Sequence, residues 1–167
     1  MRLLLPTALA AVLGGLVVLH PAGAAQNAAP AAATAPAGLP GTVLGLNVAR
    51  EDVGKTLAQV TQPEYTVNTT LYSFRDPTKL LQATLQVSDF RHGTPASSHG
   101  FQLSIVGQIG GSQPEFLQLG STTVYVTTLK GLVIAIWFRP ERMYVLAVRN
   151  TFHQPKSLLR VAVGMQP

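Results

Sequence analysis

The sequence predicts an α+β domain in which two or three helices pack on a mostly antiparallel, twisted β-sheet. Two observations lead to this prediction. Residues 65–88 and 122–149 contain β-rich runs that are separated by short turn signals. Residues 47–60, 95–109 and 155–163 instead place apolar side chains at helical spacing. Separate runs of strands and helices are typical of α+β layers.

The first β-rich segment predicts a hairpin. Residues 65–75 form one β-type run, which ends at the turn signal Arg75-Asp76-Pro77. In residues 81–88, apolar side chains alternate with Gln, Thr and Ser, as in a strand with one buried face.

The second β-rich segment predicts three successive strands. They cover residues 122–128, 132–138 and 143–149, with turns at Lys130-Gly131 and at 139–142. The middle run is apolar on both faces, which predicts a central strand covered on both sides. Residues 115–119 are expected to add a further short strand.

Three segments are expected to be helical. Asn47 is a candidate N-cap for residues 47–60, where Val53, Leu57 and Val60 form an apolar stripe. Thr94-Pro95 is typical of a helix start, so residues 95–109 are predicted as a second helix. Pro155 is expected to open a C-terminal helix, whose apolar face contains Leu158, Leu159, Ala162 and Val163.

The first 25 residues predict a signal peptide. Arg2 provides the positive start, residues 3–19 are apolar, and Ala22-Gly23-Ala24 is a site of the kind that signal peptidase cleaves. The apolar stretch is shorter than the roughly 20 residues of a spanning helix, so cleavage is favoured over a retained anchor. We therefore expect export across the cytoplasmic membrane, to the cell envelope or the medium.

Residues 26–40 are nearly all Ala, Pro and Gly, which predicts a disordered linker ahead of a single α+β domain at 41–167. The chain has no cysteine, which excludes disulfides and thiolate chemistry. Its net charge of +5 forms no dense cluster, since the nearest approach to one is spread over two predicted elements: Arg139, Arg142, Arg149, Lys156 and Arg160. We therefore interpret the charge as an aid to solubility and expect no nucleic-acid binding. Membrane contact is expected only through the leader, if it is not cleaved.

Three segments carry a resemblance to a known class. RDPTKLLQATLQVSDF (75–90), WFRPERMYVLAVRN (137–150) and QPKSLLR (154–160) resemble exported actinobacterial proteins that have no assigned function. The order of hairpin, helix, three strands and helix is similar to the PsbP-like domain. This resemblance implies a PsbP-like sandwich and an extracytoplasmic binding role. It transfers no site residue, and the lipidation cysteine of several bacterial members is absent.

No catalytic, cofactor or metal site is predicted. His92 and His99, with Asp89, do not have the spacing of a zinc site. Ser97 and Ser98 adjoin His99, but neighbouring residues rarely form a nucleophile–base pair, and no G-x-S-x-G motif is present.

Trp137, Arg139, Arg142 and Tyr144 are the candidate partner-binding residues. They flank the predicted turn at 139–142, where aromatic rings and arginines form a rim that suits a protein or polymer. The alternative is that the rings belong to the core and the arginines to a soluble turn.

The expected function is a non-enzymatic, exported binding protein whose partner is an envelope protein or polymer. One alternative is a small hydrolase that uses scattered Ser and His residues such as His99 and His153. The other is a carrier of an apolar ligand, which needs a cavity between sheet and helix.

Overall fold

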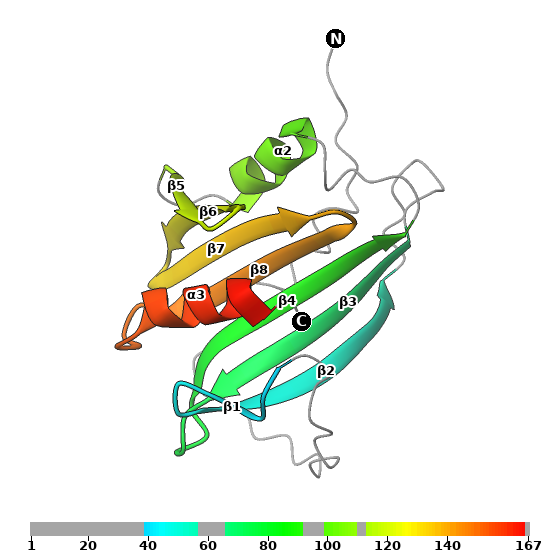
Figure 1. Ribbon diagram of the computed structural model, residues 1–167. Helices are drawn as coiled ribbons and strands as arrows, with labels where there is room; N and C mark the ends of the chain where they lie inside the picture. Colours follow the sequence, from blue (N-terminus) through cyan, green and yellow to red (C-terminus); the bar gives the residue numbers. More distant parts are fainter. Residues whose placement is uncertain (1–38, 57–65, 92–98, 110–112, 166–167) are drawn as a thin grey trace.

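The computed structural model describes residues 39–56, 66–91, 99–109 and 113–165, and a single eight-stranded antiparallel sheet dominates it (Figure 1). The strand order is β1-β2-β3-β4-β8-β7-β6-β5. The strands are β1 (Thr42–Val43), β2 (Leu46–Thr56), β3 (Thr66–Arg75), β4 (Leu81–Arg91), β5 (Glu115–Leu119), β6 (Thr122–Leu129), β7 (Leu132–Arg139) and β8 (Arg142–Arg149). Two helices, α2 (His99–Ile109) and α3 (Pro155–Met165), complete the described part.

The predicted α+β class is wrong, because the described chain is largely β. Its helices have 11 residues each, and strands form most of the rest. The prediction overestimated helix because it assigned residues 47–60 to one.

Residues 46–56 form strand β2 instead, paired along its length with β3 from Asn47↔Arg75 to Thr56↔Val67. The stripe Val53, Leu57, Val60 suggested a helix, but the buried Leu46 and Val48 are two residues apart, as on one face of a strand. Pairing with β3 satisfies the backbone groups of both strands, and this tertiary gain outweighs a weak local helical pattern.

The other strand predictions are confirmed. The hairpin is β3–β4, the three-strand run is β6–β7–β8, and the extra short strand is β5. The middle strand β7 is buried on both faces, with Ala135 and Trp137 on one side and Ile134 and Ile136 on the other. The C-terminal helix begins at Pro155 as predicted, and the second predicted helix is α2, described from His99.

The sheet consists of two four-stranded meanders, β1–β4 and β5–β8, that meet where β4 pairs with β8. The chain enters the second meander through α2 and leaves it through α3. This order places the strands that come first in each meander along the sequence, β1–β2 and β5, at the two opposite edges of the sheet.

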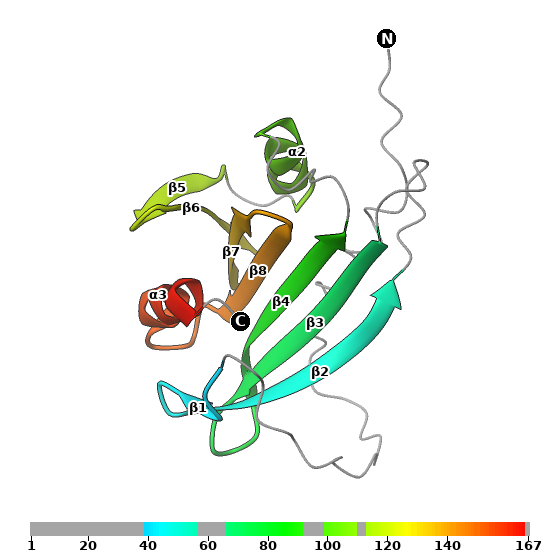
Figure 2. The ribbon, with the colours of Figure 1, turned by 45° about the vertical axis from the view of Figure 1, so that its right-hand side comes forward.

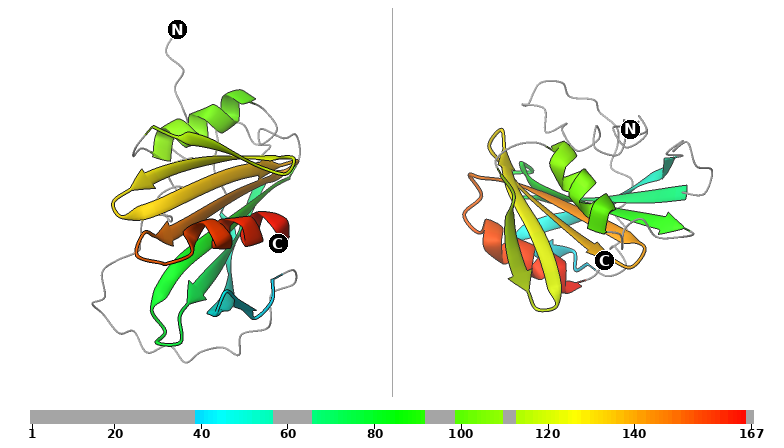
Figure 3. Two further views of the ribbon diagram at one scale, coloured as in Figure 1. Left: turned by 60° about the vertical axis from the view of Figure 1, so that its left-hand side comes forward. Right: turned by 90° about the horizontal axis from the view of Figure 1, so that it is seen from above.

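Each face of the sheet has its own core, and each core has its own helix (Figure 3). On one face, α3 packs Leu158, Leu159, Ala162 and Val163 against side chains from both meanders. On the other face, α2 packs Ile105 and Val106 against β6, β7 and β8 only. Leu39, at the end of the predicted linker, is also buried on the α3 face.

The β3–β4 turn is held by one carboxylate. Asp76 Oδ1 accepts hydrogen bonds from the Thr78 amide (2.9 Å), the Thr78 hydroxyl (2.6 Å) and the Leu80 amide (3.0 Å), and Oδ2 accepts one from Gln82 Nε2 (2.8 Å). These bonds, first of all the one from the Thr78 side chain, lower the pKa of Asp76. The ionised carboxylate of Asp76 therefore stabilises the turn.

Candidate functional site

The two aromatic residues of the predicted rim lie in the core. Trp137 and Tyr144 are opposite each other on β7 and β8, and their rings stack in parallel with centroids 5.1 Å apart. Their exposed fractions are 1% and 2%. The rings therefore stabilise the α3 face, and only the two arginines of the set remain to reach the surface.

Arg142 is engaged in an ion pair. Its Nε lies 2.5 Å from Asp89 Oδ1, across the β4–β8 pairing, and both side chains are partly exposed. A hydrogen bond with Tyr144, together with the charge of Asp89, raises the pKa of Arg142. A partly exposed pair of this kind contributes roughly 0–1 kcal/mol to stability. Its geometry supports a structural link between the two meanders.

Arg139 borders an open cleft of about 320 Å³ between α2 and the start of β6. Gln102, Thr123, Tyr125 and Phe138 also line it, and the Tyr125 hydroxyl donates to Gln102 Oε1 over 3.3 Å. The cleft is open to solvent, and its lining is mostly polar. Arg139 and Arg142 thus do not act on one shared cavity.

The histidine and serine candidates do not assemble into a described site. His92, Ser97 and Ser98 lie outside the described residues. His99 is exposed at the start of α2, and His153 is exposed beside the Phe152 ring. Within the described ranges, no group of three His, Asp or Glu side chains is placed to hold a metal ion.

A surface that the sequence analysis did not single out lies at the β5 edge. Among the described strands β5 pairs only with β6, so the backbone groups of its outer edge have no strand beside them. Phe116 is 66% exposed and Leu117 is 40% exposed. Two adjacent, exposed, large apolar side chains on an edge strand are a feature that natural sheets usually avoid.

The faces of β5 differ in what they adjoin. Phe116 lies on the α2 face, where its ring meets the Tyr125 ring edge-on at 5.3 Å. Leu117 lies on the α3 face, opposite Val124. An extended segment beside β5 would therefore meet an aromatic side chain on one face and an aliphatic one on the other.

The Leu117 side opens into a cleft of about 220 Å³ between β5 and α3, which we call the β5–α3 cleft. Figure 2 shows the ribbons of the two elements that flank it. Its floor includes Ala135, Leu146 and Val148 of the sheet, and Leu159 of α3 forms part of its wall. The lining is mostly apolar. Its volume is below the 300–1,000 Å³ typical of small-molecule sites, so it fits an apolar side chain better than a whole ligand.

The sequence contained a partial signal for this surface. Residues 115–119 were predicted as a strand, and their pattern EFLQL places large apolar groups at adjacent positions. Nothing in the sequence shows that this strand is at an edge or that α3 returns beside it. Both facts depend on the order of strands in the sheet.

Comparisons with known proteins assign no family to this chain. No protein-family model matches the chain, and a search of curated proteins finds no match. Among solved structures, a GTP-binding regulator from Thermotoga maritima is 13% identical with a TM-score of 0.45, over 75% of this chain and 82% of that one. The resemblance to PsbP-like exported proteins stays a prediction. No described helix is long and apolar enough to cross a membrane.

Proposed function

We propose that this chain is an exported, non-enzymatic protein that binds a partner protein in the cell envelope, and that an extended segment of the partner docks along β5. The observation that carries the proposal is the unpaired outer edge of β5, with Phe116 and Leu117 exposed beside the β5–α3 cleft.

The chemistry of the edge supports a polypeptide partner. An added strand supplies hydrogen bonds to the outer amide and carbonyl groups of β5, which pair with no other strand in the described part of the chain. A pocket beside the edge then selects one side chain of the added strand. The β5–α3 cleft is such a pocket, because Leu117 and Leu159 form apolar walls near the strand. An apolar-ligand carrier would use only the cleft and would leave the strand edge without a role.

Export is supported by the N-terminal residues. The apolar stretch 3–19 and the Ala22-Gly23-Ala24 site belong to a signal peptide in this proposal, and residues 26–40 connect it to the domain. The proposal is non-enzymatic because the sequence contains no nucleophile, cofactor or metal motif.

Site-specific photo-crosslinking in intact cells tests the proposal. The photoreactive residue p-benzoylphenylalanine replaces Phe116, whose exposed ring leaves room for the larger group. The matched control places it at Glu51, an exposed position on β2 at the opposite edge. We expect one discrete protein adduct from Phe116 in the envelope or medium fraction and none from Glu51.

Two results would contradict the proposal. Equal adducts from both edges would mean that β5 is not a docking edge. Recovery of the uncleaved chain from the cytoplasm alone, with the mature N-terminus determined by sequencing, would remove the export part.

A further inference from the structure

The net charge of the chain originates in its C-terminal part. Residues 130–167 contain six of the twelve Lys and Arg residues but only one of the seven acids, Glu141. Residues 1–129 contain six basic and six acidic residues and are therefore balanced. The excess of +5 belongs to the β6–β7 turn, β7, β8 and α3.

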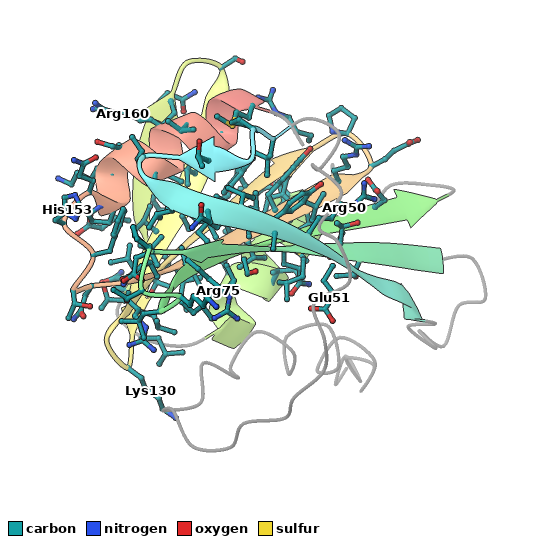
Figure 4. The ribbon with its side chains drawn as sticks, turned by 90° about the horizontal axis from the view of Figure 1, so that it is seen from below. Arg50, Glu51, Arg75, Lys130, His153 and Arg160 are labelled. Atoms are coloured by element: carbon teal, nitrogen blue, oxygen red, sulfur yellow. The ribbon has the colours of Figure 1, made fainter. Side chains whose placement is uncertain are left out.

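Part of this excess lies beside the proposed docking edge. Lys156, in the first turn of α3, lines the β5–α3 cleft. Arg160 is one helical turn further along and is exposed on the outer side of α3 (Figure 4). In the described part of the chain, neither side chain has an ion pair. On the β5 side of the cleft, Glu115 is the acid.

We propose that the docked segment is acidic, with an apolar side chain in the β5–α3 cleft and carboxylates opposite Lys156 and Arg160. This inference rests on the proposed docking at β5. Lys156 on the wall of an apolar pocket, with Arg160 one helical turn away, selects partners of opposite charge and repels those of like charge.

The same charges argue against a second copy of this chain as the occupant. An antiparallel β5–β5 pair has its twofold axis perpendicular to the sheet, so both α3 helices would lie on the same face. Lys156 and Arg160 of the two copies would then flank one seam. Like charges across a seam are unfavourable, whereas an acidic segment neutralises them.

Selection of random peptides displayed on phage tests the inference with the purified full chain at physiological salt. We expect enriched peptides to combine net negative charge with an apolar residue. The double variant Lys156→Glu/Arg160→Glu is expected to lose the preference for peptides with acidic residues. Lys79→Glu is the matched control, since Lys79 lies on the β3–β4 turn and does not line the cleft.

A synthetic copy of the best-enriched peptide gives the quantitative test. Its affinity is expected to fall about tenfold in the double variant, which is 1.4 kcal/mol. The Lys79→Glu variant is expected to bind like the original chain. Glu115→Gln is expected to bind the peptide more tightly, because it removes the acid from the other side of the cleft.

The outcomes separate the inference from the proposed function. One outcome is that the original chain enriches peptides without an excess of acidic residues, and that the Leu117→Lys variant does not enrich them. This result would overturn the acidic partner but keep β5 as the docking edge. If the Leu117→Lys variant enriches the same peptides as the original chain, or if no peptide is enriched at all, both the acidic partner and the docking at β5 would be overturned. A dimer in sedimentation experiments that Leu117→Lys dissociates would identify a second copy as the occupant and overturn the inference.

Discussion

The two edges of the sheet are built differently. At the β2 edge, β1 pairs with Leu46 and Asn47, and the Val48 amide donates to the Gly41 carbonyl just before β1. Further along, β2 carries the charged side chains of Arg50 and Glu51 on opposite faces (Figure 4). Its pairing with β3 is also interrupted by a bulge between Asp52 and Gly54. At the β5 edge the strand is short and regular, and the exposed side chains at its centre, Phe116 and Leu117, are apolar, with the exposed Glu115 and Gln118 on either side of them.

Because of this difference, the β2 edge is protected against the addition of a further strand, whereas the β5 edge is available for it. Charges and bulges are the devices by which natural sheets prevent a further strand from adding to an edge. The long β2 has both. β5 has neither at its centre, which is consistent with the proposal that a partner uses this edge.

The largest expected effect comes from removing the protection of β2. Deleting Val53, which has no partner in the β2–β3 register, preserves all the other pairs and removes the bulge. Combined with Glu51→Val, the deletion leaves a long, straighter edge with less charge. We expect concentration-dependent self-association in sedimentation velocity.

Glu51→Val alone is the control, because it keeps the bulge. If the deletion variant sediments as the original chain does at every concentration, the bulge is not what protects this edge.

An effect of intermediate size is expected in the pH dependence of two turns, β3–β4 in the first meander and β5–β6 in the second. The pKa of Asp76 is lowered in the folded state, so its stabilising effect is present above the pKa of the unfolded chain and is lost as pH falls through the folded pKa. The β5–β6 turn depends instead on the neutral Gln118, which donates to the Gly120 carbonyl and accepts from the Thr123 hydroxyl.

Acidification is therefore expected to open the β3–β4 turn before the β5–β6 turn, as measured by amide hydrogen exchange after correction for intrinsic rates. In the Asp76→Ala variant, the amides of the β3–β4 turn should already exchange faster at neutral pH, and their exchange should no longer increase on acidification. Equal acid sensitivity of both turns would contradict the assignment to Asp76.

The smallest effect concerns the centre of the sheet, away from both edges. Glu141, in the β7–β8 turn, has a φ of 63°, a left-handed conformation that costs a residue with a side chain roughly 1–2 kcal/mol. Glu141→Gly removes this strain at an entropic cost of roughly 0.5–1 kcal/mol in the unfolded chain. We expect a net stabilisation of about 0.5 kcal/mol in urea unfolding.

Glu141→Gly should leave the affinity for the acidic peptide unchanged, because Glu141 does not line the β5–α3 cleft. A change in peptide affinity without a change in stability would show that the central turn communicates with the β5 edge.

The local pattern of residues predicted most of the elements. Alternation in 81–88, the continuous apolar run at 132–138 and the proline at 155 each depend on side chains close in the sequence, and all three predictions are confirmed. The helix predicted at 47–60 is wrong for residues 47–56, where the bulge between Asp52 and Gly54 interrupts the alternation of the strand; residues 57–60 lie outside the described part. β2 is stabilised by its pairing with β3, and the two strands come together only when the chain folds.

For the candidate partner-binding residues too, the sequence predicted the secondary structure but not the exposure of the side chains. Trp137 and Tyr144 were placed correctly on neighbouring strands, yet whether their rings face a partner or the core depends on α3 covering that face of the sheet. The apolar pattern of residues 115–119 was visible, but its exposure was not.

What the sequence by itself determined are the strands β3 to β8, the two described helices and the charge excess of residues 130–167, since periodicity, turn residues and composition are local properties. The tertiary structure decided that β2 is a strand, that β4 pairs with β8 and that β5 is an edge beside α3. Each of these depends on pairing between segments far apart in the chain. The free energy of such pairing comes from backbone hydrogen bonds and buried surface that no short stretch of sequence contains.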